Sequence, residues 1–322
     1  MRAAITTRFG GPDVIEIREI ATPSPKPNEV LVQVYATTIC AADRRLRAAD
    51  PAFIRLMGLT KVLGIEFSGR VAAVGAEVSK FKAGDDVFGA TEFKVGAHAD
   101  YLCLPEDATL DFKPTNMSHE EAAAVLFGGV TALHFLRAAG VSEGNRVLVY
   151  GASGSVGVFT VQLAKHLGAH VTGVCSGANL EMVRGLGADV VLDYAREDFS
   201  AVGPVYDVVV DTVGYSGLAR SLRALKRGGV FAQVGLTGIG EMLGWWWAGV
   251  TGRIKLAGGM AVTKAGDVAL LKELVEAGSL RTVIDRRYPF EKIRDAHAYV
   301  DTGRKKGHVV IVMATLDRDT SA

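Results

Sequence analysis

The chain has 322 residues, of which 49% are hydrophobic and 22% are charged, as in ordinary globular proteins of about two domains. The 36 Lys and Arg residues nearly balance 35 Asp and Glu, so the formal net charge of +1 argues against a nucleic-acid partner or a polybasic membrane patch. Three widely spaced cysteines predict no disulfide framework. No apolar run approaches the roughly 18–20 residues that cross a bilayer, and the first residues lack a signal peptide's apolar stretch. We therefore expect a cytoplasmic protein without an integral membrane segment.

The N-terminal part of the chain, to about Leu104, is predicted to be rich in β-strands. Apolar and β-branched runs at 30–35, 69–75 and 86–89 are strand candidates, because glycine or charged residues bound them. A helical signal is confined to 40–47, where Ala, Leu and Arg favour a helix.

A capping box formed by Ser118 and Glu121 marks a change in character, because strands and helices alternate after it. Strands are predicted at 145–151, 171–175, 190–192, 205–211, 230–234 and 254–256, and helices at 156–167, 180–186, 218–225, 267–277 and near 290–300. Near-continuous Val and Leu strands that alternate with helices predict a parallel sheet covered on both faces. We expect a final strand, 309–312, to return to the sheet of the first domain.

A glycine-rich turn joins a predicted strand to a predicted helix. The turn follows the pattern G-x-G-x-x-G, with Ala152 in the place of the first glycine and Gly154 and Gly157 in the other two places. Gly154 lets the backbone approach a pyrophosphate, Gly157 lets the helix pack on the strand, and the helix N-terminus attracts phosphates. An isolated hexad would fit a surface loop equally well, but this strand-turn-helix-strand context predicts dinucleotide binding. We expect the contacts to come from Gly151, Ala152, Ser153, Gly154, Ser155, Val156 and Gly157.

The end of the second strand of this unit indicates which dinucleotide binds. An NAD enzyme normally carries Asp or Glu there to hold the ribose hydroxyls, but after Cys175 no carboxylate precedes Glu181. Ser176 and Asn179 could instead donate hydrogen bonds to a 2′-phosphate. Arg184 is the nearest candidate cation, although it could equally be a solvated helix residue. These residues favour NADPH.

Segments along nearly the whole chain match those of one family in order. They lie at 9–14, 27–32, 63–69, 81–87, 120–124, 129–133, 151–157, 187–189, 193–194 and 303–310. On these motifs the chain resembles the medium-chain dehydrogenase/reductase superfamily, in its zinc-independent quinone oxidoreductase-like branch. The resemblance implies an α/β protein with a GroES-like β-barrel catalytic domain, 1–117 and 263–322, and a Rossmann doubly wound parallel sheet, 118–262, that binds NADP. It also implies a homodimer and a small-molecule electrophilic substrate.

The resemblance also bears on metal binding. Zinc-dependent relatives use a cysteine at the position of Cys40 and a histidine at the position of Ile65, which cannot bind metal. Of the four cysteines that structural-zinc relatives carry near 91–103, only Cys103 is present. A zinc site needs three or four ligands, so we predict no metal. Cys40 would then line the cleft, in place of the Asn of zinc-free relatives, or be a small buried hydrophobe.

Without zinc, alcohol oxidation lacks its Lewis acid. The remaining chemistry is hydride transfer from a nicotinamide to a quinone or an α,β-unsaturated carbonyl. The alternatives are an NADP-dependent alcohol or aldehyde dehydrogenase-reductase and a non-catalytic NADPH-binding scaffold or sensor. Besides the turn and Cys175, Ser176 and Asn179, the resemblance assigns to the cofactor Thr131, Tyr194, Val213, Gly235, Leu236 and Met260.

No clear general acid emerges, and the catalytic candidates of the cleft are Cys40, Asp43 and Arg45. Asp43 matches a family aspartate that is expected to be structural. Arg45 stands where many relatives carry tyrosine, which puts quinone stacking in doubt and favours a polar or anionic substrate. Arg44, Arg45 and Arg47 could equally form a solvated helix face, which is our default interpretation.

Three consecutive tryptophans, Trp245, Trp246 and Trp247, lie between the predicted strands 230–234 and 254–256 of the nucleotide-binding sheet. Tryptophan is enriched at protein interfaces. We expect a subunit interface or a pocket wall here, in preference to contact with a membrane.

Overall fold

A computed structural model describes residues 1–49, 61–91, 95–235, 254–264 and 266–313. The chain divides into two compact units. Unit 1 consists of Met1–Phe127, Val268–Glu276 and Thr282–Ala322, and unit 2 consists of Gly128–Asp267 and Ala277–Arg281. Trp245, Trp246, Trp247 and Leu236 lie outside the described residues.

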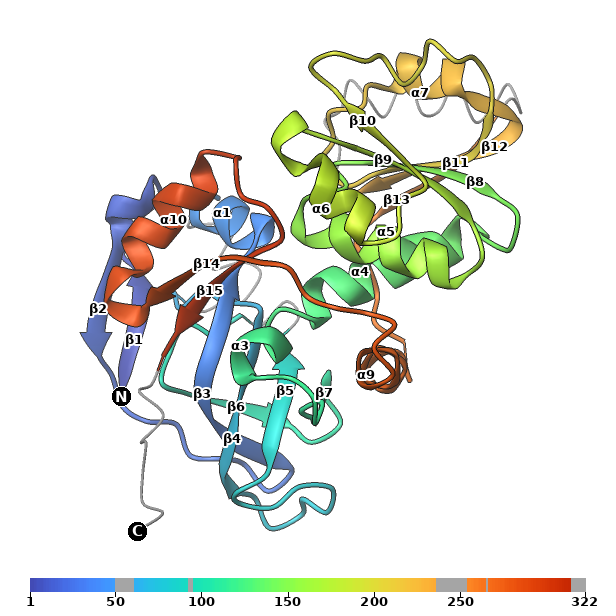
Figure 1. Ribbon diagram of the computed structural model, residues 1–322. Helices are drawn as coiled ribbons and strands as arrows, with labels where there is room; N and C mark the ends of the chain where they lie inside the picture. The colour runs from blue at the N-terminus through green and yellow to red at the C-terminus, as the bar shows by residue number, and fades with distance from the viewer. Residues whose placement is uncertain (50–60, 92–94, 236–253, 265, 314–322) are drawn as a thin grey trace. The chain divides into compact units, whose positions relative to one another are not determined.

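Unit 1 is built on a seven-stranded sheet in the order β14-β15-β3-β4-β5-β7, with β6 paired to β3. The long central strand β3, Glu29–Ile39, buries every second residue over most of its length, as a strand with one covered face does. The other strands are β4 (Glu66–Val74), β5 (Asp86–Ala90), β6 (Tyr101–Pro105), β7 (Leu110–Phe112), β14 (Ile284–Pro289) and β15 (His308–Val312). Strand β15 lies antiparallel beside β3, which confirms that the end of the chain returns to the first sheet (Figure 1).

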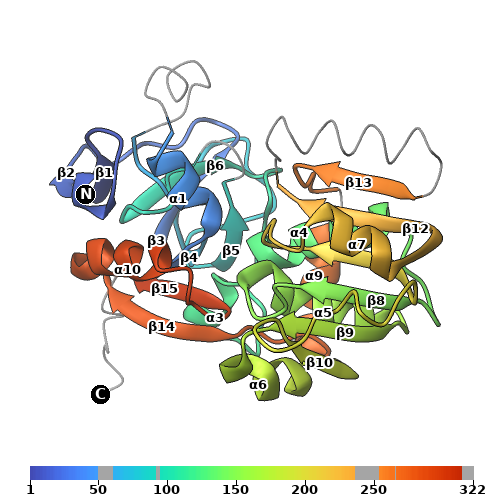
Figure 2. The ribbon, with the colours of Figure 1, turned by 90° about the horizontal axis from the view of Figure 1, so that it is seen from above.

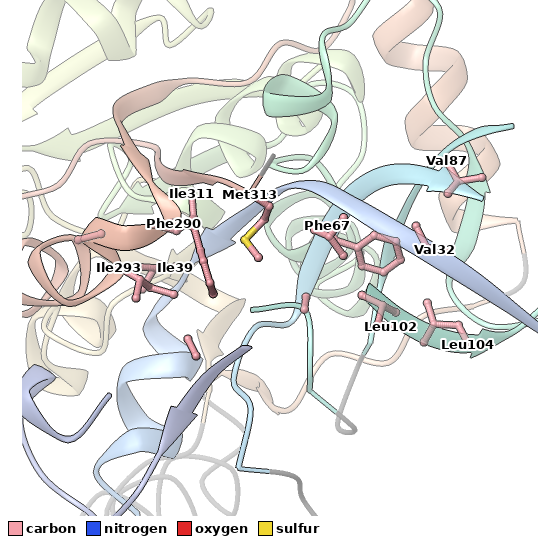
Figure 3. Close-up of a cluster of buried hydrophobic side chains, with 14 of the residues drawn as sticks. Val32, Ile39, Phe67, Val87, Leu102, Leu104, Phe290, Ile293, Ile311 and Met313 are labelled. Carbon is pink, nitrogen blue, oxygen red and sulfur yellow. The ribbon is translucent and has the colours of Figure 1, made fainter. Parts of the chain in front are cut away.

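The main core of unit 1 lies against this sheet. Figure 3 shows Val32, Phe67, Leu102 and Ile311 in one cluster of buried side chains, together with Phe290 at the start of the C-terminal helical segment. Burying each such side chain stabilises the fold by about 1.5–3 kcal/mol. Among the described residues, unit 1 also contains the hairpin β1 (Arg2–Thr6) and β2 (Ile15–Glu19), and the helices η1 (Pro12–Val14), α1 (Ala41–Arg47), α3 (His119–Ala122), η4 (Phe290–Lys292) and α10 (Ile293–Asp301).

Helix α3 begins at the capping box that the sequence predicts. The Glu121 backbone N–H donates to Ser118 Oγ over 3.3 Å, and the Ser118 N–H donates to Glu121 Oε2 over 2.9 Å. The helix packs on β3, β4 and β15. Because of that packing, α3 belongs to unit 1, and unit 2 begins ten residues later than the boundary expected after 117.

Unit 2 is a six-stranded, wholly parallel sheet in the order β10-β9-β8-β11-β12-β13. Its strands are β8 (Arg146–Tyr150), β9 (His170–Cys175), β10 (Val190–Asp193), β11 (Tyr206–Asp211), β12 (Leu225–Val234) and β13 (Lys255–Gly259). Figure 2 shows the strands fanning from β10 at one edge to β13 at the other. This arrangement confirms the predicted doubly wound parallel sheet.

Helices cover both faces of this sheet. Helices α5 (Ser155–His166) and α6 (Leu180–Gly185) lie on one face, and α7 (Leu218–Ala224) lies on the other (Figure 1). Helix α4, Leu126–Ala138, carries the chain from unit 1 into unit 2, and α9, Asp267–Glu276, carries it back.

Within the part of the chain that the structure describes, one helical segment, His119–Ala138, is long and apolar enough to cross a membrane, which the sequence-based expectation did not foresee. It comprises α3 and α4, and 72% of its most apolar window is buried inside the structure. The signal is weak, because a buried core helix passes the same test of length and composition.

Candidate functional site

The glycine-rich turn lies between β8 and α5. A Cβ atom added at Gly157 would lie 2.1 Å from the Gly151 carbonyl oxygen, so only glycine lets the first turn of α5 pass this close to the turn. At Gly154 the nearest atom to such a Cβ is 3.5 Å away. Gly154 is also the N-cap of α5 and provides no side-chain cap. A dipolar helix end that no N-cap side chain covers fits the pyrophosphate of a dinucleotide.

The loop after β11 supports this turn from the neighbouring strand. Thr212 Oγ1 donates to the carbonyl oxygens of Tyr150 and Gly151, over 2.9 and 3.2 Å. The Asp211 carboxylate in turn accepts three backbone N–H groups of its own loop, from Val213, Gly214 and Ser216. Sequence reasoning missed Asp211 and Thr212. The available signal was a polar pair at the carboxyl end of the strand beside β8, where such folds bind ligands.

Small polar residues follow β9, as the sequence indicates. Asn179 Nδ2 donates to Ser176 Oγ over 3.1 Å, so the two side chains stand together across the short helix η3, Gly177–Asn179. Cys175 is buried at the end of β9, and burial raises the pKa of its thiol to about 11. The thiol therefore stays protonated at neutral pH and is not a nucleophile there.

A carboxylate that sequence reasoning missed also stands at this turn. A Cβ added at Gly177 would lie 2.7 Å from Asp193 Oδ2. Strand β10 pairs in parallel with β9 in a register that sets Asp193 opposite Cys175, so both strands end at the same level. Arg196 Nε lies 3.8 Å from Asp193 Oδ2 with its side chain 85% exposed. Arg184, the cation proposed from the sequence, is instead paired with Glu181 on the exposed face of α6.

The other expected cofactor residues of unit 2 follow the carboxyl ends of its strands. Tyr194 follows β10, Val213 follows β11, Gly235 follows β12 and Met260 follows β13, and of these Tyr194, Val213 and Met260 are exposed. Because parallel strands end at one edge of the sheet, the fold brings these positions to that edge. Thr131 lies on α4 and is largely buried.

Two residues of unit 1, Cys40 and Ile65, stand at the positions where zinc-dependent relatives carry ligands, and their surroundings are apolar. Cys40, Ile65 and Val95 form one buried cluster. Burial, and next the nearby Asp43 carboxylate, raise the pKa of the Cys40 thiol well above its usual value. The surroundings therefore match a small buried hydrophobe. Among the residues that the structure describes, no group of three or more His, Cys, Asp or Glu side chains is placed to hold a metal ion.

The Asp43 carboxylate accepts hydrogen bonds from backbone N–H groups. Its Oδ2 accepts the Cys40 N–H over 2.8 Å and its Oδ1 accepts the Gly64 N–H over 3.0 Å, in a fully buried position. Because both oxygens are occupied by the chain itself, the structural role expected for this residue fits better than a catalytic one.

The three arginines of α1 differ in their surroundings. Arg44 and Arg45 are exposed, as a solvated helix face predicts. The same expectation is wrong for Arg47, which is buried. Its guanidinium binds His297 Nδ1 over 2.8 Å and Asp301 Oδ2 over 2.5 Å, both on α10. The buried charge is tolerated because these partners come from a helix about 250 residues away in sequence.

Unit 1 holds another buried carboxylate, Glu66 at the start of β4, which also escaped the sequence reasoning. Its Oε1 accepts from Thr38 Oγ1 over 2.5 Å and its Oε2 accepts the Phe127 N–H over 2.7 Å. Burial raises the pKa of Glu66 to about 7. The Lys305 ammonium interacts electrostatically with the Glu66 carboxylate. Burial lowers the pKa of this ammonium to about 8.

Known families and proteins match this architecture. The family model described as "Alcohol dehydrogenase GroES-like domain" matches residues 26–114, and the one described as "Zinc-binding dehydrogenase" matches residues 186–311. A GroES-like domain followed by a Rossmann-type parallel sheet, with relatives named as NAD(P)H and NADPH-dependent oxidoreductases, defines an oxidoreductase that uses a nicotinamide cofactor.

The relatives narrow this class. The chain is 34% identical to 2-methylene-furan-3-one reductase of Solanum lycopersicum, over 97% of this chain and 79% of that protein. It is 31% identical to the chloroplastic NADPH-dependent alkenal/one oxidoreductase of Arabidopsis thaliana, with the same coverage. The quinone oxidoreductase of Coxiella burnetii superposes with a TM-score of 0.89 at 29% identity, over 98% of this chain and 99% of that one. The chain belongs to the medium-chain dehydrogenase/reductase superfamily, in its quinone oxidoreductase-like branch.

Proposed function

We propose that this protein is an NADPH-dependent, zinc-free reductase that transfers hydride to a quinone or an α,β-unsaturated carbonyl. The observation that carries the proposal is the apolar cluster of Cys40, Ile65 and Val95. An isoleucine side chain has no lone pair to donate, so this cluster does not supply the ligand set of a catalytic zinc. An acceptor that is already electrophilic needs no Lewis acid to polarise it.

The names of the relatives support the same class of acceptor. One relative is named for 2-methylene-furan-3-one, in which an exocyclic carbon–carbon double bond is conjugated with a ketone, and another for an alkenal or alkenone. A solved relative is named a quinone oxidoreductase. All three kinds of compound accept hydride at a carbon that conjugation with a carbonyl makes electrophilic.

For the cofactor, we propose NADPH. When bound, its nicotinamide supplies the hydride. The uncapped start of α5 would hold the pyrophosphate, and Ser176 and Asn179 would bind the 2′-phosphate, because both side chains are small and polar and stand 3.1 Å apart. The Asp193 carboxylate accepts the Ala195 N–H over 3.0 Å and lies beside Gly177.

The test is loss of NADPH absorbance with 1,2-naphthoquinone and, separately, with methyl vinyl ketone. We expect turnover of at least one acceptor. The matched control is Gly154→Asp, whose carboxylate would repel the pyrophosphate and should abolish turnover. No turnover of either acceptor above background would overturn the reductase proposal. Stoichiometric bound zinc together with NADP-dependent alcohol oxidation would favour the alcohol dehydrogenase alternative.

The homodimer and the cytoplasmic location belong to the same proposal. Light scattering of the purified protein should give the mass of two chains, and a mass of one chain would contradict the dimer. Several relatives carry chloroplastic or mitochondrial names, so cell fractionation is the measurement that decides the location.

A further inference from the structure

We propose that Glu66 is a positioning residue, whose buried carboxylate holds the first turn of α4 and thereby places Thr131. Thr131 lies one turn beyond Phe127 on the same helix. The link from Thr131 to catalysis rests on the proposed function, because Thr131 is there an expected cofactor contact. The hold on α4 itself rests only on the contacts of Glu66.

The first line of support is a break in the helical ladder. Helices α3 and α4 are separated by a turn at 123–125. In this turn the Ala124 N–H donates to the Glu121 carbonyl and the Val125 N–H donates to the Ala122 carbonyl, so each bond spans three residues where an α-helix spans four. The first N–H groups of a helix need partners from outside the helix. For α4, a side chain from a strand provides one of them.

That partner is the Glu66 carboxylate. Its Oε2 accepts the Phe127 N–H over 2.7 Å. In its ionised form, which is populated as the pH rises through its pKa of about 7, Glu66 has two advantages over a neutral acceptor. A charge-assisted hydrogen bond is about twice as strong, and α4 presents the positive end of its dipole here. The thirteen residues of α4 are long enough for that dipole to develop.

The second line of support is the rigidity of the carboxylate. Thr38 Oγ1 on β3 donates to Glu66 Oε1 over 2.5 Å, and Thr37 Oγ1 donates to the Glu66 carbonyl over 2.6 Å. Glu66 is 1% exposed and pairs with Ala90 of β5 within the sheet. The start of α4 is therefore fastened to the central strands of unit 1 through one side chain.

The charged and titratable groups around Glu66 come from two other segments. Cys40 and Asp43 belong to the start of α1, and Lys305 before β15 contributes the positive charge. A carboxylate near a second one, Asp43, is costly to bury unless its hydrogen bonds are made. Both of its oxygens make one, and the bond to Phe127 is the one that reaches α4.

The test compares Glu66→Gln with Glu66→Leu. Glutamine keeps an acceptor for the Phe127 N–H, whereas leucine removes it. For Glu66→Leu we expect amide hydrogen exchange over 126–131 to rise roughly 10- to 100-fold, as the loss of a buried hydrogen bond to a charged group implies, while exchange of the β8 and β9 amides stays unchanged. In Glu66→Gln, amide exchange over 126–131 should stay within roughly threefold of the wild-type rate.

Two further variants keep the test decisive. Thr38→Val removes the donor to Oε1 with little change of shape, and it should raise exchange over 126–131 even if Glu66→Leu does not fold. The matched control is Glu121→Ala, which removes the capping box of α3 and should raise exchange over 118–122 alone. Unchanged exchange over 126–131 in both Glu66→Leu and Thr38→Val would overturn the proposal, and so would a uniform rise across unit 1.

NADPH affinity separates this proposal from the function on which it partly rests. If exchange over 126–131 rises and the dissociation constant of NADPH rises with it, both hold. If exchange rises while NADPH affinity stays at the wild-type value, the hold on α4 stands and the cofactor contact of Thr131 is wrong.

Discussion

At the scale of single residues, recognition of the 2′-phosphate at the adenosine end of the expected cofactor site depends on which arginine can pair with that phosphate. Arg184 is the nearer one in sequence, but its guanidinium is paired with Glu181. Arg196 is exposed and only loosely associated with Asp193, at 3.8 Å, beside Gly177. A guanidinium that is free to turn can pair with a phosphate, whereas one already in an ion pair gains less.

We therefore predict that Arg196→Gln weakens NADPH binding roughly threefold to tenfold and leaves NADH binding unchanged, since a partly exposed ion pair contributes about 1 kcal/mol. Arg184→Gln is the matched control and should change neither affinity. Fluorescence titrations with the two cofactors measure both. A loss of NADPH affinity in Arg184→Gln alone would reverse the assignment.

At the scale of elements, two glycines of one turn have separate tasks. Gly157 brings α5 against the turn, because a Cβ there would meet the Gly151 carbonyl oxygen at 2.1 Å. Gly154 has room for a methyl group within the protein, since the nearest atom is 3.5 Å away, so any need for glycine there comes from a ligand.

The pair Gly157→Ala and Gly154→Ala separates these tasks. Gly157→Ala should lower the free energy of unfolding by about 1–3 kcal/mol, as overpacking does. Gly154→Ala should leave it within about 0.5 kcal/mol but weaken cofactor binding, because the methyl group would point at the approaching pyrophosphate. Urea unfolding and cofactor titration measure the two effects. Equal loss of stability in both variants would show that Gly154 also serves packing.

The loop after β11 acts on the same turn from the side. Thr212→Val removes the hydroxyl that donates to the Tyr150 and Gly151 carbonyls, over 2.9 and 3.2 Å, at nearly constant volume. We expect cofactor binding to weaken about fivefold, corresponding to about 1 kcal/mol for one hydrogen bond. Thr160→Val is the control, because its hydroxyl bonds only the carbonyl of Val156 within α5. Unchanged affinity in Thr212→Val would mean that the strand alone shapes the turn.

At the scale of the whole molecule, stability depends on pH through buried groups that resist a change of charge. Burial lowers the pKa of His119 to about 4, and Nδ1 of the ring lies 2.8 Å from Ser68 Oγ. Between pH 4 and the ordinary value of 6.5, the unfolded chain binds a proton that the folded chain does not. Stability from this group is thus full above pH 6.5 and is lost as the pH falls toward 4.

We predict that His119→Gln loses less stability than the wild type when the pH falls from 7 to 4.5, by at most about 3 kcal/mol for a shift of this size. Urea unfolding at the two pH values measures the difference. Glu66 contributes with the opposite sign, since its raised pKa lowers stability as the pH rises toward 7, but it is common to both proteins and cancels. His166→Gln, on the exposed side of α5, should keep the wild-type dependence.

The local elements and the family could be predicted from the sequence. Apolar and β-branched runs, the capping box of Ser118 and Glu121 and the turn at 151–157 are local patterns, and the structure has strands, a helix start and a strand-to-helix turn at those places. Strand boundaries were less predictable. Strand β12 begins at Leu225, five residues before the predicted start, because pairing with β11 extends it.

What the sequence by itself determined is the alternation of strands and helices, the two domain types and the position of the dinucleotide turn, because each depends on residues that are neighbours in the chain. Only the tertiary structure decided that Asp193 stands beside Gly177, that Arg47 of α1 is buried against α10 and that Glu66 holds the start of α4. These contacts join residues from 16 positions (Gly177 and Asp193) to 254 positions (Arg47 and Asp301) apart. The pairing register of strands and the docking of helices set them, and no local pattern records either.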